Sequence, residues 1–212
     1  GRIPGSSRRI WGHPVLLDAR GLVQRFGGLT AVSGMDLTVA PGTIVGLIGP
    51  NGSGKTTLFN LVSGLYRLDE GTVLFKGQDV TGLSPHRIAR MGLGRTFQIP
   101  ALFRKMTVEE NLWVPAIDET WGGMRRRAAE LLEFFRLTSL RDEPAEVLSG
   151  GQQKVLELAR ALMRDPDLLL LDECTAGVQP AMVAELLQAI RRLRERGKAF
   201  VIIEHNMDVI QD

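Results

Sequence analysis

Two hydrophobic periods alternate along the chain. Largely apolar runs at 43–48, 168–172 and 199–204 predict strands that are buried on both faces. Apolar residues three and four positions apart at 124–135 and 155–162 predict helices with one buried face. Buried strands that alternate with helices indicate an α/β fold with a mainly parallel sheet.

The remaining segments extend this pattern. Further strands are expected at 22–26, 36–39 and 72–75, the first two around a Gly27-Gly28 turn. Further helices are expected at 55–63, 108–114 and 180–196. Pro180 suits the first turn of the last helix, and Gly197 follows its end.

The composition is that of one globular domain. The chain has 212 residues, of which 44% are hydrophobic and 24% charged, and its net charge of +2 is too small to indicate nucleic acid binding. Cys174 is the single cysteine, which excludes an internal disulfide framework and zinc sites built on cysteine pairs. His13, His86 and His205 are too scattered for a metal cluster, and no apolar run is long enough to span a bilayer. These features fit a reducing, cytosolic setting.

The strongest chemical signal is the segment 49–57, between a predicted strand and a predicted helix. It fits the pattern G-x-x-x-x-G-K-[ST], in which glycines let backbone N–H groups converge on phosphate oxygens. The helix start adds its positive dipole end, Lys55 adds a charge, and the Thr56 hydroxyl can bind Mg²⁺. The alternative is a glycine turn that arose by chance. The residues expected to bind the nucleotide are Gly49, Pro50, Asn51, Gly52, Ser53, Gly54, Lys55, Thr56 and Thr57.

Two acidic residues close the apolar strand at 168–172. This strand carries Asp172 to the carboxyl edge of a parallel sheet, next to the phosphate loop. There Asp172 would hold Mg²⁺, and Glu173 would act as the general base for a water attacking the γ-phosphate. The alternative is a pair of solvated acids at a strand end.

A second anion-binding helix start is expected at 149–152. Ser149 is a good N-cap, and Gly150 and Gly151 expose backbone N–H groups before the helix that follows Gln152. In isolation this segment would be read as a capped helix and nothing more.

Together these motifs resemble the nucleotide-binding domain of ATP-binding cassette (ABC) proteins over about residues 20–212, and 148–152 looks like that family's signature. The resemblance implies a P-loop NTPase core, an N-terminal antiparallel β subdomain and an inserted helical subdomain at about 99–150. It implies ATP and Mg²⁺ as cofactors. By the same resemblance, Gln98 contacts Mg²⁺ and faces a membrane subunit, His205 contacts the γ-phosphate, and Phe26 stacks on adenine.

The resemblance also implies a mechanism and partners. Ser149, Gly150, Gly151 and Gln152 of one copy would close on the ATP held by the phosphate loop of a second, head-to-tail copy. Hydrolysis by Glu173 would open this dimer and drive membrane permease subunits, with a solute-binding protein acting through the permease. The expected location is the cytoplasmic face of the membrane, and no nucleic acid partner is expected.

Four features depart from the family or add to it. Cys174 stands where the family usually has proline, and Gln179 replaces the usual Asp or Asn, which bears on communication across the dimer. We expect residues 1–16 to be a linker-like leader, with a joint to a fused permease as a further hypothesis. We expect the ABC domain at 17–212 to lack its last elements.

Weaker sequence similarities indicate a subfamily. The runs at 25–32, 97–112 and 204–207 are similar to ATP-binding subunits of branched-chain amino-acid importers. Subunits that serve urea, other amides or lipopolysaccharide export share much of this pattern and stay open as alternatives. ABC ATPases of translation or repair form another alternative. Repair members insert a long coiled coil, for which the spacing between Gln98 and Ser149 leaves no room.

Overall fold

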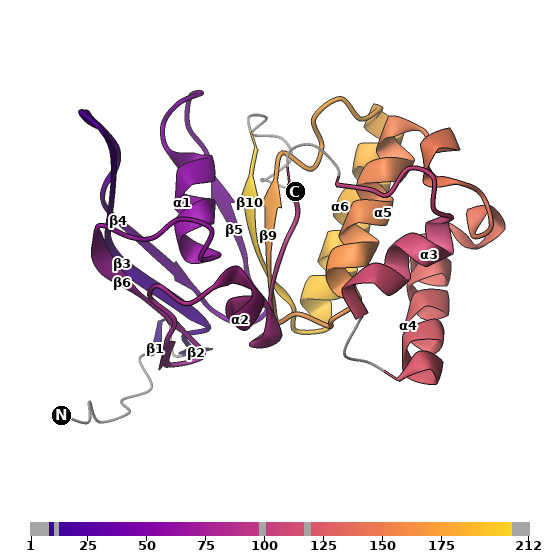
Figure 1. The fold of residues 1–212 in the computed structure, drawn as a ribbon, viewed down its shortest axis with the longest axis horizontal. Helices are drawn as coiled ribbons and strands as arrows, with labels where there is room; N and C mark the ends of the chain where they lie inside the picture. Colours follow the sequence, from indigo (N-terminus) through magenta and orange to yellow (C-terminus); the bar gives the residue numbers. More distant parts are fainter. Residues whose placement is uncertain (1–8, 11–12, 98–100, 117–119, 205–212) are drawn as a thin grey trace.

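The computed structural model describes residues 9–10, 13–97, 101–116 and 120–204 (Figure 1). β1 (Arg9–Ile10) and β2 (His13–Pro14) form a short antiparallel ribbon. The rest is organised around two four-stranded sheets. In the described part of the chain, no helix combines the length and the apolar character needed to cross a bilayer.

The first large sheet is antiparallel and has the order β4-β3-β6-β7. Its strands are β3 (Leu17–Phe26), β4 (Leu29–Val39), β6 (Glu70–Phe75) and β7 (Gln78–Asp79). Gly27 takes a φ of +58° in the turn between β3 and β4, which confirms the turn expected there. Both strands are longer than their apolar runs, because backbone pairing continues across polar residues.

The second large sheet is parallel and has the order β5-β10-β9-β8. Its strands are β5 (Ile44–Leu47), β8 (Leu93–Arg95), β9 (Leu168–Asp172) and β10 (Ala199–Ile203). Every residue of β9 and β10 is buried, as the uninterrupted apolar runs predict.

Six α-helices connect these strands in the described residues. They are α1 (Lys55–Val62), α2 (Pro85–Arg90), α3 (Val108–Trp113), α4 (Trp121–Phe134), α5 (Gly150–Leu162) and α6 (Pro180–Glu195). Short 3-10 turns occur at Val114–Ala116, Thr138–Leu140 and Ala145–Val147. Figure 1 shows α1 on one side of β9 and β10, and α5 and α6 on the other.

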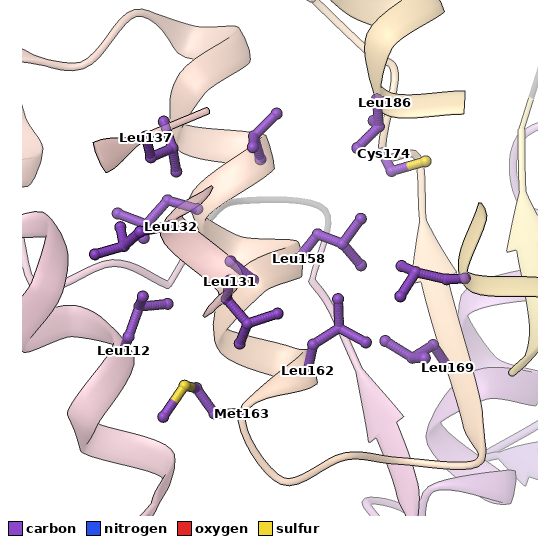
Figure 2. Packing of buried hydrophobic residues seen from close by; sticks show 14 of the residues in the cluster. Leu112, Leu131, Leu132, Leu137, Leu158, Leu162, Met163, Leu169, Cys174 and Leu186 are labelled. Carbon is purple, nitrogen blue, oxygen red and sulfur yellow. The ribbon is translucent and has the colours of Figure 1, made fainter. Parts of the chain in front are cut away.

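Two hydrophobic clusters lie on the two faces of the parallel sheet. Because successive strand residues point to opposite faces, β9 contributes Leu168 and Leu170 to one cluster and Leu169 and Leu171 to the other. The first cluster joins the parallel sheet to α1 and the antiparallel sheet. The second cluster joins it to helices α3 to α6, and Figure 2 shows its core around Leu158. Burial on both faces fixes the sheet in the centre of the molecule.

Five described strands and α-helices have no counterpart among the predicted segments: β1, β2, β7, α2 and β8. β8 has one buried apolar residue, Leu93, and its remaining positions are Gly94 and Arg95. Such a segment carries no hydrophobic run, so it becomes a strand by pairing with the buried strand β9.

Candidate nucleotide-binding site

The phosphate loop lies between β5 and α1. Two of its glycines have left-handed backbones, Gly52 with a φ of +79° and Gly54 with a φ of +89°. A Cβ at Gly54 would overlap the carbonyl oxygen of Ala31 on β4, so glycine is needed there for space as well as for conformation. Residues 50–53 are exposed, so the loop presents its backbone to solvent.

The amino end of α1 leaves its backbone donors without a side-chain partner. Its N-cap is Gly54, which supplies no side-chain cap, so the first N–H groups of the helix remain available to a ligand. The Lys55 ammonium donates to the carbonyl oxygens of Gly49 (2.7 Å) and Pro50 (2.8 Å). These bonds hold the charge of Lys55 over its own loop.

The structure brings Asp172 next to this loop. Asp172 ends β9 and is 2% exposed. Burial raises the pKa of the Asp172 carboxyl and Glu173 adds to the rise, whereas Arg95, the Thr56 hydroxyl and Lys154 oppose it. Its Oδ1 atom has no hydrogen-bond partner in the described structure.

This arrangement fits a divalent cation. A buried carboxylate oxygen without a partner, beside the Thr56 hydroxyl, is an oxygen donor set of the kind that Mg²⁺ prefers. Among the described residues, no group of three His, Cys, Asp or Glu side chains could hold a metal by itself. The protein therefore offers a partial set of ligands, which a nucleotide phosphate would complete.

Glu173 directly follows the carboxyl end of β9 and has a left-handed backbone, with a φ of +49°. Its N–H donates to the carbonyl oxygen of Ile203 at 3.0 Å, and its side chain is partly exposed. A non-glycine residue held in this conformation is uncommon and is often associated with functional sites. It turns the chain away from the strand directly after Asp172.

The second predicted anion site is a well-formed helix start. The Ser149 hydroxyl accepts from the N–H of Gln152, and the Gln152 side chain accepts from the N–H of Ser149, which completes a capping box. A Cβ at Gly151 would lie 2.7 Å from Cγ of Met182, so a larger residue here would force the Met182 side chain on α6 to move. Within one chain this segment does not meet the phosphate loop, because α5 and α1 lie on opposite sides of β9 and β10 (Figure 1).

Phe26 ends β3 and is 45% exposed. Its ring makes an edge contact with Tyr66, with centroids 5.5 Å apart. The exposed ring is available for stacking, and Tyr66 is an additional aromatic residue that the sequence pattern did not single out.

Gln98 and His205 lie outside the described residues, as does most of the proposed leader.

Cys174 is buried and packs in the second hydrophobic cluster near Leu186 (Figure 2). Burial raises the pKa of the Cys174 thiol, which favours a packing role over a nucleophilic one. Gln179 is the N-cap of α6, and its side chain makes no capping hydrogen bond to the helix.

Three residues near the site were assigned no role from the sequence: Arg95, Lys154 and Glu204. The side chains of all three contact the last residue of β9 or the turn that follows it. Arg95 approaches Asp172, Lys154 donates to the carbonyl oxygen of Glu173, and Glu204 accepts from the N–H of Thr175. Each is far in sequence from the group it contacts, so no local pattern identifies it.

The sequence profile of the ABC transporter family matches residues 32–176. The chain belongs to this family. It is 41% identical over 213 residues to LivG of Escherichia coli K12, a high-affinity branched-chain amino acid transport ATP-binding protein, and covers 84% of that relative and 92% of itself. It is 40% identical over 195 residues to LptB of Haemophilus influenzae, a lipopolysaccharide export system ATP-binding protein, covering 81% of that relative and 91% of itself.

Solved ATP-binding cassettes have the same fold. A nucleotide-free cassette from an ABC transporter superposes with a TM-score of 0.86 at 35% identity, covering 93% of this chain and 84% of that one. A dimeric cassette in a post-hydrolysis state, bound to ADP and phosphate, has a TM-score of 0.81 at 26% identity, covering 91% of this chain and 89% of that one. These likenesses confirm the expected cassette fold, and membership of the family identifies the chain as an ATPase.

Proposed function

We propose that this ABC ATPase is the energy-coupling subunit of an importer of branched-chain or other hydrophobic amino acids. The observation that carries the catalytic part is the contact of Thr56, on the phosphate-loop helix, with Asp172 at the end of β9, directly before Glu173. The similarity to LivG supports the choice of solute. The similarity to LptB keeps lipopolysaccharide export as the second candidate.

In this proposal the loop N–H groups and Lys55 bind the β- and γ-phosphates of ATP, and Phe26 stacks on adenine. Thr56, Asp172 and Gln98 would hold Mg²⁺, which neutralises phosphate charge when bound. Glu173 accepts a proton from the attacking water, and His205 contacts the γ-phosphate. Gln98 and His205 are assigned by family resemblance alone.

The signature segment 149–152 belongs to the other half of a composite site. Within one chain, this segment lies away from the phosphate loop of the same chain. The start of α5 is capped but exposed, so it can contact a nucleotide bound by a second chain. We therefore place a second ATP-binding subunit opposite this one, head to tail. A dimeric cassette among the similar solved structures supports this arrangement.

A groove supports docking to a permease. It has a volume of about 290 Å³, and its apolar lining includes Leu65, Ala89 and Leu93. Arg160 and Arg164, which are partly exposed, also line it, so an amphipathic segment would find both apolar and charged contacts. Phe97, which precedes the proposed membrane-facing Gln98, lies in this groove and is 44% exposed. We propose that a short cytoplasmic segment of the permease occupies it, with a solute-binding protein acting on the far side of the membrane.

ATP turnover by a Glu173→Gln variant tests the catalytic assignment. The amide keeps the size of the side chain but removes the base, so we expect turnover to fall by at least about 100-fold while nucleotide still binds. Glu185→Gln, which changes an exposed carboxylate on α6, is the control and should keep normal turnover. Unchanged turnover in Glu173→Gln would overturn the assignment.

A further inference from the structure

The turn at 173–176 is held at both of its ends. The N–H of Glu173 donates to Ile203 of β10 at 3.0 Å, and the N–H of Ala176 donates back to the carbonyl oxygen of Glu173 at 3.2 Å. Between these bonds Glu173 has its left-handed backbone. A strained conformation of this kind persists only where surrounding contacts enforce it.

Glu204 supplies one of these contacts from the residue after β10. Its carboxylate is 3% exposed, and Oε1 accepts from the N–H of Thr175 at 3.0 Å. The same oxygen lies 3.5 Å from the sulfur of Cys174. A buried carboxylate that accepts a backbone N–H forms a strong, directional bond, so Glu204 fixes the middle of the turn.

Lys154 supplies the second contact from α5. Its side chain is buried in the packed interior, and Nζ donates to the carbonyl oxygen of Glu173 at 3.3 Å. That oxygen therefore accepts from both Lys154 and Ala176. Because α5 begins at the signature segment, Lys154 links the signature helix directly to the backbone of the proposed base.

We propose that Glu204 and Lys154 are positioning residues, which hold the turn 173–176 and so set where the Glu173 carboxylate stands. This inference rests on the proposed role of Glu173. Neither residue needs to touch the nucleotide. Loss of either contact lets Glu173 relax towards an ordinary backbone conformation, which moves its carboxylate away from the attacking water. A displacement of about 1 Å is enough to cost a large factor in rate.

The test compares turnover and nucleotide affinity in three variants. For Glu204→Ala we expect kcat to fall by about 10-fold to 100-fold, with the Kd for Mg-ATP within about twofold of the parent value. Glu204→Gln keeps an oxygen that accepts from Thr175, so it should recover most of the lost kcat. Glu109→Ala removes another buried carboxylate, one that bonds Arg141 on the far side of the molecule, and should leave kcat unchanged even where stability falls.

A double-mutant cycle identifies the route by which Glu204 acts. In a Glu173→Gln background, Glu204→Ala should cause little further loss, because the group it positions is already gone. A further loss of kcat equal to that in the parent would overturn the proposal, because Glu204 would then act independently of Glu173, for example through the adjacent His205. Lys154→Met gives an independent answer if Glu204→Ala does not fold: its kcat should fall while its Kd for ATP, measured without Mg²⁺ because the charge of Lys154 also acts on Asp172, stays within about twofold of the parent value.

The outcomes separate this inference from the proposed function. If Glu173→Gln turns over ATP normally, the assignment of the base is wrong. If Glu173→Gln is inactive but Glu204→Ala and Lys154→Met keep the parent kcat, only the positioning role is wrong.

Discussion

The guanidinium of Arg95 lies 3.8 Å from the carboxylate of Asp172, and both side chains are buried. Arg95 also donates to Asn60 Oδ1 at 2.6 Å and to Ser63 Oγ at 3.0 Å. One cation thus connects β8, the acidic end of β9 and the helix of the phosphate loop. Burial lowers the pKa of Arg95, and the opposing charge of Asp172 offsets part of that effect.

Replacing Arg95 by leucine should destabilise the protein by about 3 kcal/mol, because Asp172 would be left buried without its counter-charge. Denaturant unfolding measures the difference. Arg87→Leu changes an exposed arginine on α2 and should stay within about 0.5 kcal/mol of the parent. Equal stability of the two variants would show that the Arg95–Asp172 contact contributes nothing.

Two glycines of the phosphate loop should respond differently to alanine. Gly54→Ala combines a positive φ with an overlap on Ala31 and should cost about 3 kcal/mol or more in free energy of unfolding. Gly52→Ala has a similar φ but open space around its Cβ, so we expect a cost of about 1 kcal/mol. Denaturant titration measures the free energy of unfolding of both variants. Equal losses of stability in the two would contradict the prediction.

The signals that the sequence carries plainly are local ones. The strand, glycine loop, Lys55 and helix of the nucleotide site are contiguous, and β9 and β10 are continuous apolar runs, so both could be predicted. Arg95, Lys154 and Glu204 act through contacts with residues far away in the chain. Their roles depend on how β8, α5 and β10 pack, which no short pattern encodes.

The sequence pattern does not identify Tyr66 or the shortest elements, for similar reasons. Tyr66 contacts Phe26 only because the segment after α1 returns to the end of β3. The strand β8 and the helix α2 are too short to show a period of their own, and they form because neighbouring elements supply pairing and packing partners.

The stability of the protein should carry a pH dependence from Glu157 on α5. Burial raises the pKa of Glu157, while the N–H groups of Phe97 and Ala101 and the charges of Lys154 and Arg160 oppose the rise. The folded protein therefore binds this proton more tightly than the unfolded chain. The contribution of Glu157 becomes less favourable as the pH rises from the ordinary range of a glutamate through its raised pKa.

Glu157→Gln removes this titration. We expect the variant to gain free energy of unfolding relative to the parent at about pH 8, and the gain to shrink towards about pH 3, where the parent carboxyl is almost fully protonated in both states. Urea unfolding at the two pH values measures the change. A gain that is constant with pH would contradict the assigned cause.

The groove beside Phe97 gives a prediction about coupling. Ala89 on α2 lines this groove, and an Ala89→Glu change would place a charge among its apolar residues. We expect basal ATP turnover to stay within about twofold, because Ala89 is none of the residues proposed to bind nucleotide or Mg²⁺, and co-purification with the permease to be lost. Retention of the complex would show that the permease docks elsewhere.

Equilibrium binding of Mg-ATP to the purified protein tests the central claim most directly. The Lys55 ammonium already lies over the loop, on the carbonyl oxygens of Gly49 and Pro50. We therefore predict saturable binding by the parent and a loss of affinity of at least about tenfold in Lys55→Ala. Lys105→Ala, which changes an exposed lysine outside the loop, should bind like the parent. Absence of saturable binding by the parent, or equal affinity in Lys55→Ala, would contradict the account.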